Sequence, residues 1–363
     1  MSLVNVAALL GGIGLYGLIM WDVVKTTISL HGGGPLTQRI MRWVGKLVDW
    51  SENSDAEGMS TPQGWLAGHS LLVLTLTLFA VWFTGLLLSM AIVLTADPTS
   101  ILDSSKVGES PSFVDRLYFV GASLTTAGFG PFRPAGVYWQ LVTVAVAVSG
   151  LVVSSLGISY VISLVSAVLQ QRKLAREISN LGATPREVLS YHFSQGSFTG
   201  FSEWGSTLAE QLIGHSAQHL AYPVIHFVRA IDRRDSVPVA VACLDETLSI
   251  LLFEVPKHAQ PPLHQLVVLR RAITTYLASA QTQFVDTLPA EPAWPDCSWL
   301  FDDFGLQRTF IVDQLAPTER TALAQRRRLL RALVKSANVR WANVPEQLTR
   351  GSEQSLDANI AKL

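Results

Sequence analysis

The chain has 363 residues, of which 49% are hydrophobic and only 15% are charged, and its mean hydropathy is +0.32. These values exclude an ordinary soluble protein, because a chain so poor in charge must place part of its length in lipid. The formal net charge of -1 gives no general reason to expect a nucleic-acid partner. Residues 1–170 hold only 7 of the 27 basic and 9 of the 28 acidic residues, which predicts a membrane part followed by a soluble part.

The first predicted element is a transmembrane helix within residues 1–25. Leu3 to Val24 is apolar over about the 20 residues that a helix needs to cross a bilayer, although Asp22 and several glycines are unusual in a span. We expect this helix to be retained, because the first basic residue, Lys25, follows the apolar run, whereas in a signal peptide it precedes it. Residues 26–64 predict a cytoplasmic linker containing a basic amphipathic helix, either at the membrane surface or solvated.

Two further segments, residues 65–96 and 137–169, contain no Asp, Glu, Lys or Arg and are long enough to cross. They define a predicted membrane domain at 65–170. Basic residues cluster before the first of these spans and after the second, at Arg172, Lys173 and Arg176. The positive-inside rule therefore places residues 171–363 in the cytoplasm of a multi-pass plasma-membrane protein, which is the inner membrane if the cell is bacterial.

A short helix lies between these two spans. Ser112 and Asp115 have the spacing of a capping box, which predicts a helix over Phe113 to Leu124. This helix is too short to cross, so it must enter the membrane and return. Lipid tolerates such a return only where it lines a water-filled path inside protein. The return segment reads Thr125-Thr126-Ala127-Gly128-Phe129-Gly130.

The return segment has the composition of an ion-coordinating filter. Successive carbonyls can replace an ion's hydration shell only if they face one axis, which requires backbone angles that L-residues avoid at alternate positions. Gly128 and Gly130 can adopt these angles, and Thr126 adds a hydroxyl oxygen at the inner end. We expect Ala127 and Phe129 to turn their side chains into the packing behind the filter.

The number of oxygens that an ion needs predicts the assembly. One chain supplies one oxygen per layer, so a cage of several oxygens requires four copies around an axis, which is a homotetramer. The carboxyl end of the short helix directs its negative dipole toward the cavity, and this favours a cation.

The motif Thr-Thr-x-Gly-Phe-Gly, set after a short helix and between two spans, resembles the pore module of the tetrameric potassium channels, whose filter reads TVGYG. The resemblance covers about residues 66–170 and makes 65–170 the predicted pore domain. It implies potassium at the carbonyls of Thr126, Ala127, Gly128 and Phe129, with Gly130 closing the filter, and no other cofactor. Pro131 replaces the usual Asp and Ala122 a frequent carboxylate, so we expect some hydrogen bonds that brace the filter to be missing.

The second uncharged span is predicted to line the inner pore. Gly150 resembles the hinge glycine of the family's inner helix, and Gly157 lies two turns further on. We expect bending at Gly150, or pivoting near Gly157, to open an intracellular gate. The serines between residues 149 and 166 fit either a water-lined face or close helix packing. No span carries the regularly spaced arginines of a voltage sensor.

Residues 171–363 predict an α-helical cytoplasmic domain, because their apolar spacing is mostly helical and is broken at prolines and Gly182. His215 and His219 share one helix face, and His226 follows. These three histidines could hold a metal or sense pH, or they could be packed structural histidines, which is the commoner case. We predict no resident metal.

A basic amphipathic helix is predicted from Thr318 to Ala337. It could bind anionic lipid or a ligand phosphate, but such a charge run is usually a solvated face or a subunit contact. Cys243 and Cys297 have no partner ligands at metal spacing and are expected to be reduced and buried.

The residues together predict an all-α membrane protein that conducts cations, most plausibly potassium, passively through a homotetramer embedded in lipid. The cytoplasmic domain would assemble the subunits and regulate opening. No enzymatic activity is expected, because no phosphate-binding loop, nucleophile elbow or His-Glu-x-x-His motif occurs. Two alternatives are a potassium transporter subunit, and a membrane-anchored sensor, receptor or enzyme that acts through residues 180–363.

Overall fold

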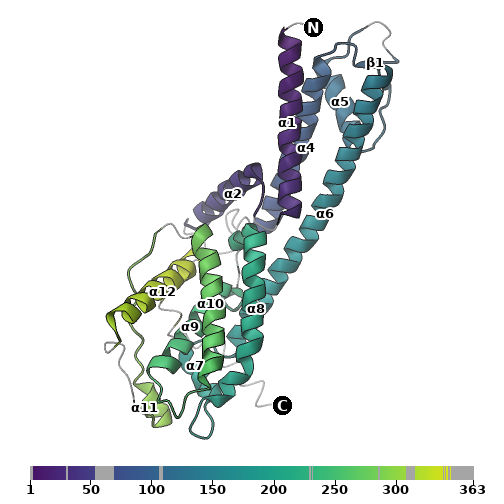
Figure 1. The fold of residues 1–363 in the computed structure, drawn as a ribbon. Coiled ribbons are helices and arrows are strands. Elements are labelled where there is room, and N and C mark those ends of the chain that lie inside the picture. The colour runs from purple at the N-terminus through teal and green to yellow at the C-terminus, as the bar shows by residue number, and fades with distance from the viewer. Residues whose placement is uncertain are drawn as a thin grey trace. The chain divides into compact units, whose positions relative to one another are not determined.

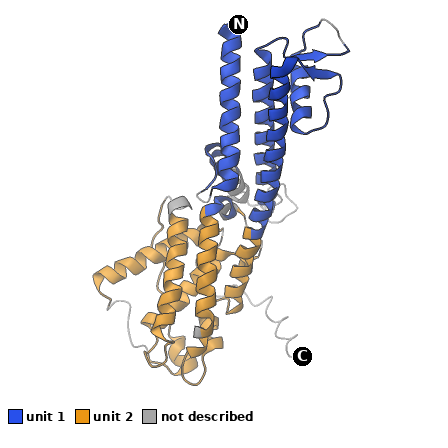
Figure 2. Cartoon of the chain, turned by 45° about the vertical axis from the view of Figure 1, so that its right-hand side comes forward, with its two compact units in different colours: residues 1–166, 221–227 blue, residues 167–220, 228–363 orange. Residues whose placement is uncertain are grey.

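The computed structural model describes residues 3–29, 32–53, 69–105, 109–228, 230, 232–284, 287–307, 315–337, 339, 341 and 344. Helices dominate the fold (Figure 1). The chain divides into two compact units, shown in different colours in Figure 2. Unit 1 contains residues 1–166 and 221–227, and unit 2 contains residues 167–220 and 228–363. The sequence suggested one boundary near residue 170 and gave no sign that 221–227 return to unit 1.

Unit 1 contains the membrane helices. These are α1 (Leu3–Ile28), α4 (Ser70–Thr95) and the first part of α6 (Gly136–Asn180), and all three are long and apolar enough to cross a membrane. The three predicted spans are thus confirmed as helices. α6 has 45 residues, and at 1.5 Å per residue its length of about 68 Å is more than twice the roughly 30 Å of a bilayer's hydrocarbon core.

Smaller elements complete unit 1. They are α2 (Pro35–Asn53), the short helix α5 (Phe113–Leu124), strands β1 (Ile101–Asp103) and β2 (Phe132–Pro134), and a 3₁₀ turn, η2 (Pro223–Phe227). η2 packs against both α2 and α4. The predicted linker helix and the short helix both form, the latter with the predicted bounds. Residues 54–68, including the start of the span predicted at residue 65, lie outside the described residues.

Two glycines bring α1 and α4 close together. A Cβ atom on Gly12 of α1 would lie 2.7 Å from Cγ2 of Val93 and 2.8 Å from the backbone oxygen of Ser89. A Cβ atom on Gly85 of α4 would lie 2.5 Å from Cδ1 of Ile19. Small residues allow such an approach, and van der Waals packing is a main source of helix association in lipid. Of the glycines that looked unusual for a span, Gly12 is thus a packing contact, whereas Gly11, Gly14 and Gly17 have open space around their Cβ positions.

Asp22, near the end of α1, joins the start of α2 to the middle of α4. Its side chain is fully buried, and its carboxylate accepts hydrogen bonds from the backbone N–H of Leu36 at 2.8 Å, the Thr37 hydroxyl at 2.6 Å and the Trp82 indole at 3.1 Å. Leu36 and Thr37 lie in the first turn of α2, where backbone N–H groups have no partner within the helix. Asp22 of α1 thus caps α2 and anchors both helices to α4.

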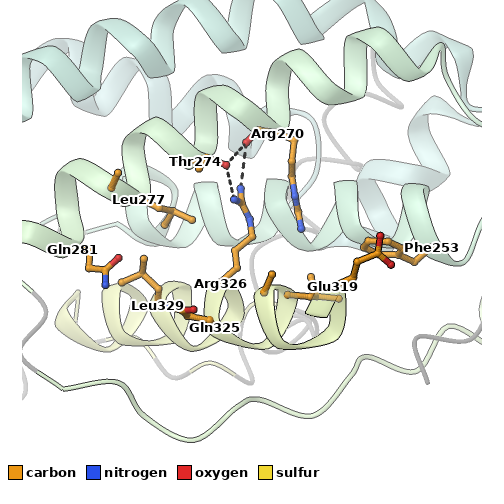
Figure 3. A pocket seen from close by; sticks show the side chains of 12 residues that line it. Phe253, Arg270, Thr274, Leu277, Gln281, Glu319, Gln325, Arg326 and Leu329 are labelled. Atoms are coloured by element: carbon orange, nitrogen blue, oxygen red, sulfur yellow. Dashed lines mark hydrogen bonds between the residues drawn. The ribbon is translucent and has the colours of Figure 1, made fainter. Parts of the chain in front are cut away.

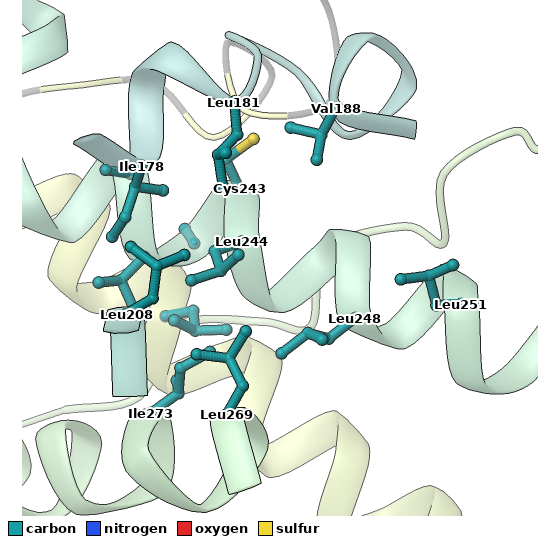
Figure 4. Close-up of a cluster of buried hydrophobic side chains, with 14 of the residues drawn as sticks. Ile178, Leu181, Val188, Leu208, Cys243, Leu244, Leu248, Leu251, Leu269 and Ile273 are labelled. Carbon is teal, nitrogen blue, oxygen red and sulfur yellow. The ribbon is translucent and has the colours of Figure 1, made fainter. Parts of the chain in front are cut away.

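Unit 2 is built around one buried helix, α9 (Val237–Phe253), of which 14 of 17 residues are buried. α7 (Pro185–His192), α10 (Leu263–Phe284) and α12 (Pro317–Ser336) pack on it. α8 (Ser202–Ala221) and α11 (Trp299–Phe304) complete the unit. In Figure 4 the side chains of Leu244 and Leu248 from α9 lie among those of Leu208 from α8 and Leu269 and Ile273 from α10. The predicted helical domain is confirmed.

Replacing Asp22 by Ala should destabilise unit 1 strongly. The substitution leaves buried N–H and O–H groups without acceptors, at a cost of about 1–3 kcal/mol each. We expect a clearly lower midpoint of thermal unfolding for the protein in neutral detergent, measured by the loss of monodisperse protein. The matched control is Asp302→Ala, which removes an exposed carboxylate and should leave the midpoint unchanged. Equal midpoints for the two variants would contradict the structural role of Asp22.

Candidate ion pore

The short helix α5 is fixed at its start by the predicted capping box. The Ser112 hydroxyl accepts a hydrogen bond from the backbone N–H of Asp115 at 3.2 Å, and the Asp115 carboxylate accepts one from the backbone N–H of Ser112 at 2.8 Å. The helix ends at Leu124, where the N–H of Thr125 still bonds to the carbonyl of Gly121 at 3.0 Å. α5 therefore leads directly into the return segment.

The backbone of the return segment is left-handed at every second residue. The φ angles are +56° at Thr126, +93° at Gly128 and +56° at Gly130. The sequence predicted this alternation and its two glycines, but not a threonine at its first position. A β-branched residue in this region is strained by about 1–2 kcal/mol. Such strain persists only where the surrounding structure imposes it, and it clusters at functional sites.

The inner side of the segment packs on α5. The ring of Phe129 contacts that of Phe119 with centroids 5.1 Å apart, and the N–H of Ala127 bonds to the carbonyl of Ala122 at 3.0 Å. A Cβ atom on Gly130 would lie 3.0 Å from the hydroxyl of Tyr118. Phe129 thus packs behind the segment as expected. Thr126, Ala127 and Gly128 are exposed in the single chain, so the packing of Ala127 behind the segment stays a prediction.

A two-stranded ribbon braces the outer end of the segment. β1 and β2 pair antiparallel, with Leu102 opposite Arg133, and β2 begins two residues after Gly130. The carbonyl of Pro131 accepts a hydrogen bond from the N–H of Ser104 at 2.9 Å and another from the Ser104 hydroxyl. The sequence gave no sign of this ribbon. The segment is therefore held from outside by backbone pairing, although Pro131 and Ala122 carry no carboxylate.

A second contact network lies beside the ribbon. The Asp97 carboxylate accepts a hydrogen bond from the indole of Trp139 at 2.8 Å, which joins the end of α4 to the start of α6. Arg116 of α5 is buried and donates to the carbonyls of Pro111 at 2.6 Å and Pro98 at 3.2 Å. These side chains fix the height at which α5 sits between the two spans. The sequence contained them, but nothing in their spacing pointed to these partners.

The two glycines predicted as a hinge lie at close helix contacts. A Cβ atom on Gly150 would overlap the backbone carbonyl of Leu124, the last residue of α5. A Cβ atom on Gly157 would overlap the ring of Phe79 on α4. Residues 136–180 form one continuous helix through both positions. Close packing therefore explains both glycines, and bending at either one stays a prediction.

The serines of α6 fall into two groups. Ser149 is buried and hydrogen-bonds to the Tyr16 hydroxyl of α1, so it belongs to helix packing. Ser155, Ser159 and Ser166 are exposed and recur every four to seven residues, which places them on one face of the helix. Helix packing thus explains Ser149, and a water-lined face at the exposed serines stays a prediction.

Residues 71–167 match a protein family described as "Ion channel". These residues form an ion channel pore module. The match includes nearly all of α4, the whole of α5 and the return segment, and α6 as far as Ala167.

A second comparison covers almost the whole chain. A Bacillus subtilis (strain 168) protein named "Uncharacterized membrane protein YdjJ" is 29% identical over 342 residues, which are 93% of this chain and 96% of that protein. No solved structure gives a significant match. The pore module and the three apolar helices make this chain a membrane protein with an ion channel domain.

The histidines predicted as a possible sensor are buried in unit 2. The rings of His215 and His219 on α8 have centroids 5.8 Å apart, and the ring of His215 lies 5.6 Å from that of Tyr276 on α10. Burial lowers the pKa of His215 to about 3 and that of His219 to about 4. Both are therefore neutral at physiological pH. The side chain of His226 lies outside the described residues.

No metal site accompanies these histidines in the described part of the chain, where no group of three or more His, Cys, Asp or Glu side chains could hold an ion. Cys243 and Cys297 are buried, as predicted, and neither forms a disulfide in the described structure. Burial raises the pKa of the Cys243 thiol to about 12, so the thiolate that binds metals and reacts is absent at neutral pH.

The basic helix α12 is less solvated than its charge run suggested. Arg327 is buried and pairs with the buried Glu246 of α9 at 2.8 Å, with its guanidinium 4.8 Å from the ring centroid of Trp294. Arg326 pairs with the buried Asp245 at 2.6 Å. The expectation of a solvated face or subunit contact was thus wrong for these two arginines. They pair with two carboxylates of α9, and the apolar spacing of the sequence gave no sign that α9 packs against α12.

Replacing Gly150 by Ala should destabilise the pore module. The new methyl group would meet a backbone carbonyl, which cannot rotate away, and overpacking of this kind costs about 1–3 kcal/mol. We expect a lower thermal midpoint together with reduced ion flux. Gly14→Ala is the matched control, because a Cβ atom on Gly14 of α1 has nothing within 4 Å. A normal midpoint with altered gating would instead favour a hinge at Gly150.

The buried histidines should make stability depend on pH without making the flux do so. Their pKa values are lower in the folded than in the unfolded chain, where an imidazole has a pKa near 6.5, so the unfolded chain binds more protons. The free energy of unfolding should fall as the pH drops below about 6.5 toward 4, by up to about 1.4 kcal/mol per pH unit and group. His215→Phe should flatten this dependence in thermal unfolding, whereas His258→Phe, at an exposed site, should not. A flux that changes between pH 5.5 and 8 only in the protein with His215 would restore the sensor hypothesis.

Proposed function

We propose that this protein is a potassium channel in which four copies of the chain surround one filter made by residues 126–130. The observation that carries the proposal is the left-handed backbone at Thr126, Gly128 and Gly130, directly after a capped helix that is too short to cross. Left-handed angles at alternate residues let consecutive carbonyls face the same side, which a stack of dehydrated ion sites requires.

The exposure of the filter supports a tetramer. Thr126, Ala127 and Gly128 are exposed in the single chain, although they lie between membrane helices. Backbone groups cannot remain exposed to hydrocarbon, so this side must face water or other protein. Four copies around an axis satisfy both needs, because each supplies one oxygen per layer and together they shield the ion path from lipid.

Cation preference has a source in α5. The helix points its carboxyl end at the start of the filter, so the partial negative charge of its dipole would face a water-filled cavity at the inner end of the pore. The exposed face of α6 that carries Ser155, Ser159 and Ser166 would line this cavity and supply hydroxyl groups to a hydrated ion.

Regulation by unit 2 has a covalent route. α6 continues without interruption from the pore module to Asn180, which lies in unit 2. The chain then returns to unit 1 at residues 221–227, where η2 packs on α2 and α4, before it re-enters unit 2. A rearrangement of unit 2 would therefore act on the pore module at two points. We place unit 2 in the cytoplasm, following the basic residues Arg172, Lys173 and Arg176.

The filter can be tested by potassium flux into liposomes that contain the pure protein. Gly128→Ala places a methyl group at a φ of +93° inside the filter and should abolish potassium flux or its preference over sodium. Gly136→Ala is the matched control, because Gly136 also has a positive φ of +72° and open space around its Cβ position but begins α6 outside the filter. It should cost similar strain, about 1–2 kcal/mol, and keep the selectivity.

Three results would oppose the proposal. One is the absence of potassium flux at every pH tested when the liposomes contain an intact wild-type oligomer. Another is an equal loss of selectivity in both glycine variants, which would indicate general strain. The third is a cross-linked assembly of two or three chains, since neither closes a filter with four oxygens per layer.

A further inference from the structure

A groove of about 510 Å³ lies between α10 and α12 in unit 2. Arg270 of α10 and Arg326 of α12 enter it from opposite sides (Figure 3). Its volume is within the range of about 300–1,000 Å³ that small-molecule sites occupy. Nothing in the pore module requires this groove, and the sequence gave no sign of it.

The buried charges beside the groove do not balance. Arg270 and Arg326 share a single carboxylate, that of the fully buried Asp245, at 2.9 Å and 2.6 Å. The neighbouring carboxylate, Glu246, is already paired with Arg327. One guanidinium charge is therefore left without a buried counter-charge. Burial lowers the pKa of Arg270, and the Asp245 carboxylate only partly opposes this effect.

The side chain of Arg270 also has hydrogen-bond donors that remain available to a ligand. Arg326 donates to Asp245, to the Thr274 hydroxyl at 2.7 Å and to the carbonyl of Arg270 at 3.4 Å. Arg270 uses only its Nη1 atom, which donates to the carbonyl of Asp245 at 3.0 Å and the hydroxyl of Ser249 at 2.9 Å. Its Nε and Nη2 atoms donate to no residue in the described part of the chain. A guanidinium edge of this kind fits a carboxylate or a phosphate.

The walls of the groove define the rest of the ligand. Apolar side chains of Phe253, Leu277, Leu323 and Leu329 line it. Gln281 and Gln325 add amide groups, and Glu319 adds a carboxylate that disfavours a second negative charge on the ligand. The lining thus suits an apolar body that carries one anionic group.

We propose that the groove between α10 and α12 binds an organic monoanion, a carboxylate or phosphodiester attached to an apolar body, with Arg270 as its anchor. The proposal goes beyond ion conduction and does not depend on it, because it concerns a binding site within unit 2 alone. A soluble organic acid and the head group of an anionic lipid share this chemistry.

Binding can be measured by ¹⁹F NMR on the full-length protein in phosphatidylcholine nanodiscs, with 4-(trifluoromethyl)benzoate as the probe. The neutral 4-(trifluoromethyl)benzyl alcohol has nearly the same shape and reports partition into lipid. We expect saturable binding of the benzoate, and affinity for the alcohol at least tenfold weaker. Arg270→Gln should reduce benzoate affinity at least tenfold, while Arg326 still pairs with Asp245 and keeps the fold intact.

Two further variants separate the site from general effects. Arg328→Gln removes one exposed charge from α12 without touching the groove, so benzoate affinity should stay within twofold of wild type. Ala322→Trp fills the groove from its exposed rim and should block binding without removing a charge. The inference is overturned if the benzoate binds no better than the alcohol, or if Arg270→Gln and Arg328→Gln have equal effects.

The same assay distinguishes the two sources of ligand. Nanodiscs in which phosphatidylglycerol replaces a fifth of the phosphatidylcholine present a phosphodiester monoanion in the bilayer. If they displace the benzoate from wild type, the groove takes a lipid head group. If benzoate binding is unchanged, the groove takes a soluble organic acid. Either result supports a monoanion site, because both require saturable, Arg270-dependent binding.

Discussion

The pore module depends on one backbone contact, between Gly150 of α6 and Leu124 at the end of α5. The return segment begins one residue after Leu124, so this contact sets where the segment starts relative to the end of α5. Any side chain at position 150 would separate the two. The outer end of the return segment is held independently, by the β1–β2 ribbon and the hydrogen bonds to Pro131. A strained segment fixed at both ends can keep its strain, and this is how Thr126 remains left-handed.

α1 shows how residues that argue against a membrane span can be its strongest contacts. Asp22 and the glycines lower the apolar character of Leu3–Ile28, yet Gly12 accommodates Val93, and the Asp22 carboxylate satisfies the open end of α2. A buried carboxylate is tolerated because its oxygens accept several hydrogen bonds. α1 therefore packs on α4 and holds the start of α2 against it.

Local patterns in the sequence predicted local structure well. The three spans, the capping box at Ser112, the ends of α5 and the glycines of the return segment all follow from residues that are close together in the sequence. The ribbon that braces Pro131, the Asp97–Trp139 bond and the overlap of Gly150 with Leu124 join residues that are distant along the chain. No periodicity encodes such partners. Asp22, a charged residue in an apolar helix, was the one sign in the sequence of a long-range contact. An acidic residue at such a position looks the same whether it caps another helix, pairs with a charge or shows that the predicted span is wrong.

The same ambiguity explains why α9 was not recognised as the centre of unit 2. It is apolar on all sides, like a membrane helix, but its 17 residues fall short of the roughly 20 that a crossing needs. Asp245 and Glu246 would each cost on the order of 3 kcal/mol near the centre of a bilayer. In unit 2 they pair with Arg270, Arg326 and Arg327 instead. Removing one partner from such a buried pair is far more costly than forming the pair is favourable. The two acids therefore act against insertion of α9 into the membrane, and they fix which faces of α10 and α12 turn toward α9. Because three arginines meet these two carboxylates, one arginine at the α10–α12 groove has no buried carboxylate of its own.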